Sequence, residues 1–326
     1  MRVLITGITG QDGSYLAKML LDIGYTVFGI YRRISTPDFW RLNELEILDR
    51  VQMIQADLTD ASSLVRAVEI SQPDYVFNLG AQSHVGASFD QPLSTLEATG
   101  LGVVRLLEAV KAVKPDARFY QAGSSEMFGN SIVHNVPLDE DSPLMPASPY
   151  AIAKLAGYHA CKIYRESYGI QASNGILFNH ESPLRGMEFV TRKITDAVAR
   201  IKAGRMKSVE LGNIDARRDW GYAPEYVRAM LLMLQQDTPG DYVIATGESH
   251  SVREFLTRAF KAVDLQWEDH VKLNGKFTRP NDVRYLLGDA RKARSVLGWE
   301  PQVKFEGLVD LMIEADLARV RRATNG

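Results

Sequence analysis

Cysteine is nearly absent from this chain. The single residue, Cys161, excludes an internal disulfide and a metal cluster held by cysteines. It lies in a run with helical spacing, where we expect a buried and unreactive thiol. No segment approaches the roughly 20 consecutive apolar residues of a membrane span. The chain enters a strand-like run at once, without a cleavable signal, so we expect a cytoplasmic protein that does not bind membranes.

A charge excess of one sign is also lacking. Lys and Arg number 38 against 40 Asp and Glu, which gives a formal net charge of −2. This balance provides no general attraction to nucleic acid, so we expect none as a partner. Of the six histidines, His180 lies at a predicted strand end and the others show no ligand spacing, so no metal site is expected. The 326 residues, 45% of them hydrophobic, suffice for one large domain with an attached lobe.

Short β-rich runs alternate with longer helical patterns in the first half of the chain. This alternation predicts an α/β fold of the Rossmann type, a doubly wound parallel sheet with helices on both faces. In such sheets ligands gather at the carboxyl ends of the strands, and the motifs below follow the predicted strands. The strands are expected at 3–6, 26–31, 51–55, 75–79, 119–122 and 175–178, with helices at 13–23 and 61–70 among those between them.

A glycine-rich turn follows the first predicted strand. Gly7, Gly10 and Gly13 are spaced by two residues each and lead into a helical run. Glycines permit a tight turn and let backbone N–H groups approach a pyrophosphate at a helix N-terminus. Three glycines alone are weak evidence, so the flanking strand and helix carry the prediction. The candidate cofactor-binding residues here are Gly7, Ile8, Thr9, Gly10, Gln11, Asp12 and Gly13.

The second strand is followed by Arg32 and Arg33, where an NAD-binding protein usually carries an acidic residue. Arginine suits a 2′-phosphate, which predicts NADP as the cofactor. A solvated basic pair is the alternative, but the position after the strand favours cofactor binding by Arg32. After the third strand, Asp57 and Leu58 could hold the adenine, although Asp57 could equally cap the next helix.

Tyr150 and Lys154 are four residues apart, so both lie on one face of a predicted helix. Four prolines in 130–149 predict an ordered excursion that brings Tyr150 to the start of this helix. A free phenol has a pKa of about 10, and a nearby ammonium and an oxidised nicotinamide favour the phenolate. Tyr150 is therefore a candidate base for a sugar hydroxyl that loses hydride. By itself, a Tyr and a Lys at this spacing are usually exposed helix residues without a function. The preceding motifs make the pair a functional signal.

Ser124, Ser125 and Glu126 follow the fifth predicted strand. Ser124 would form a hydrogen bond with the reacting hydroxyl and complete a Ser/Tyr/Lys trio with Tyr150 and Lys154. Glu126 is informative because alcohol oxidation needs no second carboxylate. Oxidation of a carbinol to a ketone acidifies the neighbouring C–H, and a carboxylate placed there can remove that proton and assist loss of a β-hydroxyl. Without its neighbours, Glu126 would be read as a solvated or structural residue.

Longer segments around these motifs carry a family resemblance. At 7–16, 78–85, 177–183, 189–193 and 218–221 the sequence resembles the GDP-mannose 4,6-dehydratase family of the extended short-chain dehydrogenase/reductase superfamily. The similarity runs nearly end to end. It implies that Tyr150, with Ser124 in the family's threonine position, deprotonates the C4 hydroxyl, that Glu126 abstracts the C5 proton and helps expel the C6 hydroxyl, and that Lys154 holds the nicotinamide ribose. The cofactor would take hydride from C4 and return it to C6.

The resemblance also implies binding residues, a substrate and an assembly. The substrate would be a GDP-sugar. The family is tetrameric, with the loop 32–35 reaching a neighbouring subunit's cofactor region, so a homo-oligomer, a tetramer or a dimer, is implied for this chain. Residues 1–178, with roughly 222–248 returning, are assigned to the NADP-binding domain, and 179–221 with 249–326 to the substrate lobe. Further cofactor candidates are Arg33, Ser35, Leu79, Gly80, Ala81, Gln82, Ser83, His180 and Arg185. Substrate candidates, besides Ser124 and Glu126, are Ser83, Val85, Ser125, Asn179, Val190, Lys193, Arg218, Arg279 and Asp282.

Some positions depart from the family pattern. Gly123 and Ser124 replace bulkier residues next to the reacting sugar, and Asp282 replaces a glutamate. The extra room suggests an alternative substrate, GDP-D-glycero-D-manno-heptose. A dTDP-glucose dehydratase is disfavoured by Ser125, where such enzymes place Asp, and a sugar 4-epimerase needs no Glu126. A non-catalytic NADP sensor remains a further alternative, although it would be expected to carry a damaged trio.

Overall fold

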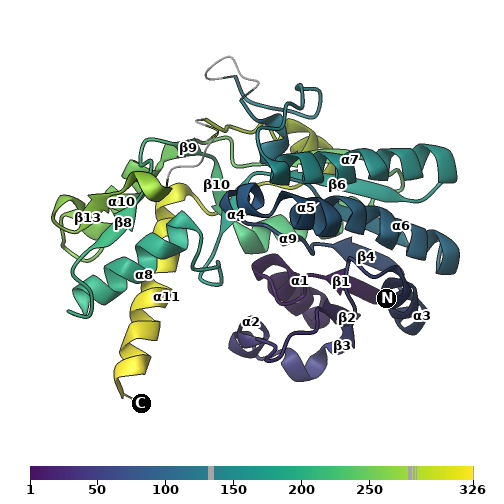
Figure 1. Cartoon of the computed structure of the whole chain (residues 1–326), viewed down its shortest axis with the longest axis horizontal. Coiled ribbons are helices and arrows are strands. Elements are labelled where there is room, and N and C mark those ends of the chain that lie inside the picture. Colours follow the sequence, from purple (N-terminus) through teal and green to yellow (C-terminus); the bar gives the residue numbers. More distant parts are fainter. Residues whose placement is uncertain (131–135, 278–280, 282, 284, 326) are drawn as a thin grey trace.

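A computed structural model describes residues 1–130, 136–277, 281, 283 and 285–325 (Figure 1). Over these residues the main sheet has seven strands in the order β11-β6-β5-β4-β1-β2-β3, and every neighbouring pair is parallel. The predicted α/β class is therefore confirmed. The strands are β1 (Arg2–Thr6), β2 (Thr26–Tyr31), β3 (Gln52–Gln55), β4 (Tyr75–Asn78), β5 (Arg118–Ala122), β6 (Ala172–Leu177) and β11 (Asp241–Ile244).

Helices cover both faces of the sheet because successive strand residues point to opposite sides. Val3 belongs to the core formed with α1 (Gln11–Asp22) and α9 (Ala223–Gln235). Its neighbour Leu4 belongs to the opposite core, formed with α3 (Ala61–Ser71), α6 (Gly102–Val113) and α7 (Pro149–Tyr168). Cys161 on α7 is fully buried in this second core, and burial raises the pKa of its thiol, as expected for an unreactive cysteine.

The start of α7 follows from its sequence. The Ser148 hydroxyl accepts a hydrogen bond from the Ala151 amide at 3.1 Å, and Pro149 occupies the first helical position. The helix ends at Gly169, whose φ of +69° is in the left-handed region. Tyr150 and Lys154 thus lie in its first two turns, where the sequence predicted them.

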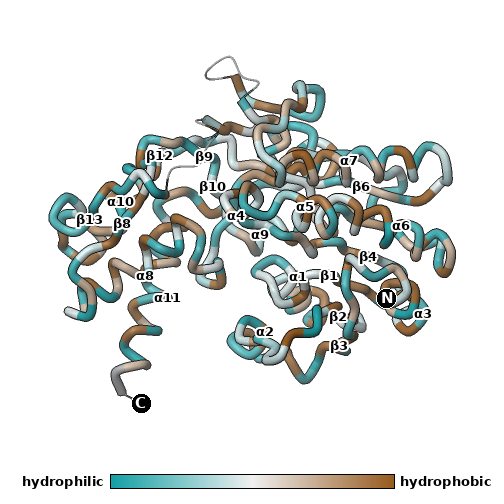
Figure 2. Tube along the Cα trace, in the orientation of Figure 1, coloured by the Kyte–Doolittle hydropathy of each residue, from teal (hydrophilic) through white to brown (hydrophobic). Residues whose placement is uncertain are grey.

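The second half of the chain builds a separate core. It is formed by α8 (Val190–Lys202), α10 (Val252–Lys261) and α11 (Phe305–Asn325), whose apolar and polar residues alternate along the tube of Figure 2. Three small sheets support these helices: β7 (Asn179–Glu181) with β10 (Trp220–Tyr222), β8 (Val209–Leu211) with β13 (Val271–Leu273), and β9 (Arg217–Arg218) with β12 (His250–Ser251). Ser251 and Glu254 form a capping box at the start of α10.

The chain returns to the main sheet at α9 and β11 before it completes this second core. The limits of the two predicted domains remain a prediction. In the described part of the chain, no helix is long and apolar enough to cross a membrane. The remaining short elements are α2 (Trp40–Glu44), η1 (Leu48–Arg50), α4 (Val85–Asp90), α5 (Pro92–Thr95), the π-helix η2 (Leu96–Leu101), η3 (Ser125–Phe128), η4 (Trp267–Asp269), η5 (Gly275–Phe277) and the π-helix η6 (Ala293–Leu297).

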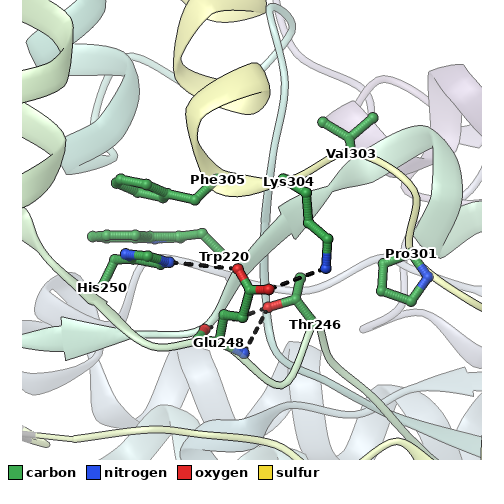
Figure 3. Close-up of a pocket in the computed structure, with 8 residues that line it drawn as sticks. All are labelled: Trp220, Thr246, Glu248, His250, Pro301, Val303, Lys304 and Phe305. Atoms are coloured by element: carbon green, nitrogen blue, oxygen red, sulfur yellow. Dashed lines mark hydrogen bonds and ion pairs between the residues drawn. The ribbon is translucent and has the colours of Figure 1, made fainter.

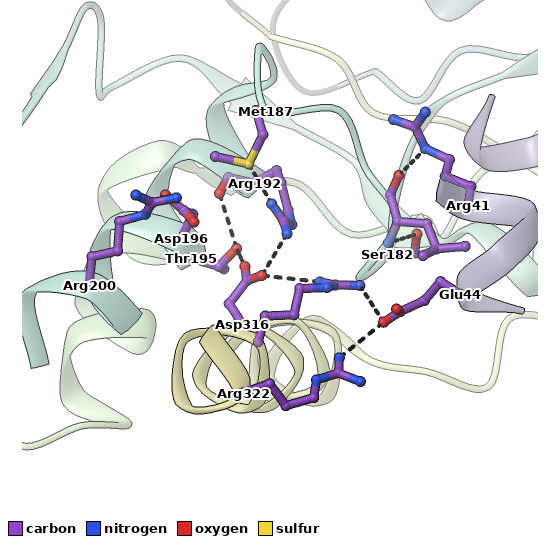
Figure 4. Close-up of polar contacts among 12 residues, drawn as sticks. Arg41, Glu44, Ser182, Met187, Arg192, Thr195, Asp196, Arg200, Asp316 and Arg322 are labelled. Atoms are coloured by element: carbon purple, nitrogen blue, oxygen red, sulfur yellow. Dashed lines mark hydrogen bonds and ion pairs between the residues drawn. The ribbon is translucent and has the colours of Figure 1, made fainter. Parts of the chain in front are cut away.

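A buried ion pair joins α8 to α11 (Figure 4). The Arg192 guanidinium lies 2.7 Å from the Asp316 carboxylate, which also accepts bonds from Thr195 and Arg319 at 2.7 and 3.1 Å. Arg319 continues to Glu44 on α2 at 3.3 Å. The C-terminal helix is thereby connected to the edge of the cofactor half of the molecule.

Replacement of Asp316 by Ala should destabilise the protein by about 3–5 kcal/mol, because it leaves the buried Arg192 charge without its partner. The measurement is the free energy of unfolding in urea. The matched control is Asp196→Ala on α8, whose partner Arg200 is half exposed and whose loss should cost less than ~1 kcal/mol. Equal losses of unfolding free energy in the two variants would contradict the stabilising role of the buried Arg192–Asp316 ion pair.

Candidate active site

The glycine-rich turn between β1 and α1 has a backbone that only glycine fits. Gly7 has a φ of +69°, and a Cβ added there would lie 2.8 Å from the Gly80 nitrogen. A Cβ on Gly13 would lie 2.7 Å from the Ile8 Cα. Helix α1 begins after Gly10 without a side-chain cap, which leaves first-turn N–H groups for an anion. The turn therefore suits the pyrophosphate of a dinucleotide.

The Asp12 and Gln11 side chains fasten this turn to β7. Asp12 lies 2.7 Å from the His180 imidazole, whose other nitrogen meets the Phe178 carbonyl at 2.7 Å. Burial opposes both charges, yet the Asp12 carboxylate raises the pKa of His180, and His180 in turn lowers the pKa of Asp12. Gln11 donates to the His180 carbonyl at 3.1 Å and accepts from Ser182 at 2.7 Å. Two of the predicted cofactor residues, Asp12 and His180, thus bind each other directly.

Arg41 is a residue of this region that sequence reasoning missed. Its guanidinium donates to the Thr9 carbonyl at 3.0 Å and to the Leu184 carbonyl at 2.7 Å. It therefore links the glycine-rich turn to the segment after β7. No local pattern announces this role, because Thr9 and Leu184 are distant from α2 in the sequence.

The predicted adenosine side lies at the ends of β2 and β3. Arg32, Arg33 and Ser35 are exposed directly after β2. The Asp57 carboxylate accepts from the Thr59 amide at 2.9 Å, whereas the cap of α3 is Asp60. The alternative of Asp57 as the helix cap is therefore wrong, and its adenine contact remains a prediction. Leu58 packs closely on the glycines of the neighbouring segments, Gly80 and Gly102.

The loop after β4 is held at both ends. The Gly80 amide donates to the Thr6 hydroxyl at 2.9 Å, and the Gln82 amide donates to the Thr99 hydroxyl at 2.9 Å. Thr99 lies in the π-helix η2, an irregularity of the kind that often occurs at functional sites. The loop contains the predicted cofactor residues Leu79, Gly80, Ala81, Gln82 and Ser83, and Val85 begins α4 directly after it.

The four predicted catalytic side chains meet beyond the carboxyl end of β5. Ser124, Glu126, Tyr150 and Lys154 are each at most 9% exposed. The Ser124 side chain lies close enough to lower the pKa of Tyr150, and the Glu126 carboxylate lies close enough for its charge to raise it. The Ser124 hydroxyl also accepts from the Glu126 amide at 3.2 Å, and buried Ser125 lies between them. The predicted trio and the additional carboxylate thus belong to one site.

Burial sets the proton affinities of the helix pair. It raises the pKa of Tyr150 to about 12 and lowers the pKa of Lys154 to about 8. The Lys154 ammonium donates to the Ala122 carbonyl at 2.7 Å and lies 5.7 Å from the centre of the Tyr150 ring. Lys154 is therefore anchored to β5 while facing the phenol.

The predicted substrate residues lie on several elements of the second half. Asn179 pairs with Trp220 between β7 and β10, and Val190 begins α8. Burial lowers the pKa of Lys193, one turn along α8. Arg218 is buried in β9, where its guanidinium donates to the Arg217 carbonyl at 2.9 Å. Arg185 lies 3.5 Å from the centre of the Phe189 ring, whereas Arg279 and Asp282 lie outside the described residues.

Asp219, within the segment 218–221, has a structural role, because its hydrogen bonds are made to the protein itself. Its fully buried carboxylate accepts from the Thr246 amide and hydroxyl at 2.8 and 2.6 Å and from the Gly247 amide at 2.9 Å. Burial raises its pKa to about 6. A pocket beside it is lined by Trp220 and seven other residues (Figure 3), none of them a predicted site residue. In this pocket the Lys304 ammonium lies 3.0 Å from the Glu248 carboxylate, so these two charges of the lining neutralise each other.

The structure corrects the argument for a roomier sugar site at Gly123. A Cβ added at Gly123 would lie 2.7 Å from the Gly175 carbonyl oxygen and 3.3 Å from the Met127 Cε. The missing side chain therefore faces β6 and η3, and its absence opens no space for a larger sugar. The expectation of extra room at this position was wrong because the side-chain direction depends on the register of β5 with β6.

Comparisons with known proteins agree with this site. A family model described as GDP-mannose 4,6 dehydratase matches residues 4–312. GDP-mannose 4,6 dehydratase 1 of Arabidopsis thaliana is 50% identical over 98% of this chain and 90% of its own length. The Homo sapiens GDP-mannose 4,6 dehydratase is 46% identical over 99% of this chain and 93% of its own length.

Solved structures show the same architecture. A UDP-glucose 4-epimerase of Thermus thermophilus in complex with NAD has a TM-score of 0.85 and 26% identity, and the match covers 97% of this chain and 99% of that one. The fold and the site thus define an enzyme of the extended short-chain dehydrogenase/reductase superfamily. Within that class, the chain belongs to the GDP-mannose 4,6-dehydratase family. The predicted family and the predicted hydro-lyase class are confirmed.

The buried ammonium generates a prediction about stability. Because the pKa of Lys154 falls from 10.5 to about 8 on folding, the unfolded chain binds more protons between these values, and stability should rise with pH there. Without cofactor, Lys154→Met should therefore be more stable than the parent below pH 8, by roughly 3 kcal/mol at most, and the gain should shrink towards pH 10.5.

Urea unfolding of both proteins from pH 6 to pH 10 measures this difference. Lys162→Met, about two turns further along α7, is the control and should give a difference that does not change with pH. A constant difference for Lys154→Met would show that the lysine is not destabilised by burial.

Proposed function

We propose that this protein converts GDP-mannose to its GDP-4-keto-6-deoxy form by loss of water. The observation that carries the proposal is the placement of Glu126 beside the Ser124/Tyr150/Lys154 trio at one strand end. Alcohol oxidation needs the trio alone, whereas elimination needs a second acid/base group. The names of the relatives from Arabidopsis thaliana and Homo sapiens support the same activity.

The residues of the site have distinct roles in this reaction. Tyr150, with the Ser124 side chain beside it, takes the proton of the C4 hydroxyl. Glu126 then removes the C5 proton, which the C4 ketone has acidified, and delivers a proton to the departing C6 hydroxyl. Lys154 holds its ammonium on the Ala122 carbonyl, beside the phenol. The dinucleotide, when bound, accepts a hydride from C4 and returns it at C6.

The cofactor is proposed to be NADP. The close approaches at Gly7 and Gly13 and the uncapped start of α1 fit a pyrophosphate. Arg32, exposed after β2, would pair with the 2′-phosphate that distinguishes NADP from NAD. RMD from Pseudomonas aeruginosa, which shares this fold at 22% identity, was solved with NADPH. The other cofactor residues predicted above are part of this proposal.

The substrate and the assembly complete the proposal. Asn179, Val190, Lys193 and Arg218 would surround the GDP group, with the arginine suited to a forked phosphate contact. Ser83, Val85 and Ser125 would face the sugar side. The protein would act as a homo-oligomer, a tetramer or a dimer, in which the exposed loop 32–35 reaches a neighbouring subunit.

Incubation of the purified protein with GDP-mannose and no added reductant should yield a 4-keto sugar, detected by its alkali-induced absorbance. No net reductant is needed because the hydride taken at C4 returns at C6. GDP-D-glycero-D-manno-heptose serves as the comparison, and we expect the higher kcat/KM for GDP-mannose because Gly123 opens no extra space. Absence of product from both sugars, despite bound NADP, would favour a non-catalytic sensor.

Glu126→Gln should lower kcat by roughly 10²–10⁴-fold while leaving NADP affinity within twofold, because it removes a proton-transfer group and no cofactor contact. Turnover and the dissociation constant of NADP are the two measurements. Glu166→Gln, an exposed site on helix α7, is the matched control and should keep full turnover. Full turnover in Glu126→Gln would refute the acid/base assignment.

A further inference from the structure

A row of polar side chains crosses the interior of the main sheet. Thr6, Asn78, Gln121, Asn174 and Asp241 are register partners on β1, β4, β5, β6 and β11. Each is buried, with at most 9% of its surface exposed. Buried polar groups cost free energy unless they are hydrogen-bonded, so a row of five requires partners.

One half of this row connects the cofactor edge to the catalytic lysine. The Gly80 amide donates to the Thr6 hydroxyl at 2.9 Å, and Thr6 donates to Asn78 Oδ1 at 2.6 Å. The Asn78 side-chain amide donates to Gln121 Oε1 at 2.7 Å. Gln121 Nε2 donates at 3.0 Å to the Ala122 carbonyl, which is the acceptor of Lys154 at 2.7 Å.

The other half of the row, Asn174 and Asp241, is bonded to Arg165 on α7 and, among the described residues, does not reach the catalytic lysine. Asn174 donates to Asp241 at 2.8 Å, and Arg165 binds the same carboxylate with two hydrogen bonds of 3.0 Å. These contacts hold α7 to β11 at Arg165, three turns beyond Lys154. Gln121 is therefore the member of the row at which the chain of bonds reaches the acid/base pair.

We propose that Gln121 is a positioning residue for the reaction, which fixes the Ala122 carbonyl under Lys154 and joins it to the cofactor loop at Gly80. The inference rests on the function proposed above. An amide is suited to this place because it accepts from Asn78 with its oxygen and donates to Ala122 with its nitrogen. Ala122 also precedes Ser124 by two residues, so the same anchor holds the end of β5 next to the serine that caps η3.

The Gln121→Leu variant breaks both bonds at nearly constant volume. We expect kcat to fall by about 10–100-fold and the KM for GDP-mannose to stay within twofold, because misplacement of Lys154 and Tyr150 affects proton transfer more than sugar binding. The control is Tyr120→Phe on the same strand. The Tyr120 hydroxyl is buried without a hydrogen-bond partner among the described residues, so its loss should leave kcat within twofold.

The Gln121→Glu variant gives a readout that a purely structural role would not move. A protonated carboxyl accepts from Asn78 and donates to Ala122, whereas the carboxylate cannot donate. The variant should therefore be most active at low pH and lose kcat as the new carboxyl ionises. Neither the parent nor Gln121→Leu should show this additional limb of the pH profile.

A second measurement does not depend on turnover. Acetic anhydride labelling, followed by peptide mass spectrometry, reports the reactivity of Lys154 with Lys162 as the internal reference. In Gln121→Leu the labelling of Lys154 should change severalfold, and in Tyr120→Phe it should not. Unchanged labelling together with unchanged kcat would overturn the positioning role. A parent protein inactive on GDP-mannose would overturn the proposed function instead, and the labelling would still decide the role of Gln121.

Discussion

The hydrogen bond from Lys154 to the Ala122 carbonyl is the contact on which the site depends. It joins the first turns of α7 to the end of β5, and the strand then continues directly into Ser124 and Glu126. This one backbone carbonyl thus sets where the Lys154 ammonium and the Tyr150 phenol on α7 lie relative to the two side chains after the strand. Because that carbonyl is part of a seven-stranded sheet, it has little freedom to move. The reacting groups are supported by an interior strand of the main sheet.

The sequence predicted the elements whose causes are local. The central strands and the proline-led start of α7 each follow from residues that are neighbours in the chain. The site could be predicted to the same extent, since parallel strands bring their carboxyl ends to one edge and the motifs follow those ends. Ser124 and Tyr150 meet for this reason, although they are distant in the sequence.

What could not be predicted depends on contacts between distant segments. Arg41 binds the carbonyls of Thr9 and Leu184, and nothing near it in the sequence identifies those partners. Asp219 lies in a segment that resembles a substrate motif, yet its carboxylate binds the Thr246–Gly247 backbone. Gly123 was interpreted as space for the sugar, and only the register with β6 shows that its missing side chain faces Gly175. In each case the residue type was known from the sequence, but the direction in which the residue faces could not be predicted from it.

In the proposed reaction, the pKa values of Tyr150 and Lys154 would link the acid/base chemistry to the bound cofactor. Burial raises the pKa of Tyr150 to about 12, and the nearby Glu126 charge acts in the same direction, so the free enzyme holds a neutral phenol. The same burial lowers the pKa of Lys154 to about 8, which weakens the cation that would stabilise a phenolate. An oxidised nicotinamide brings a positive charge to this poorly hydrated place, where charge interactions are stronger than in water. Its binding would therefore lower the pKa of Tyr150 at the same moment that the hydride acceptor arrives. In the proposed reaction, acid/base activity would then belong to the complex in which hydride can also move, and proton loss from the sugar would be limited to that complex.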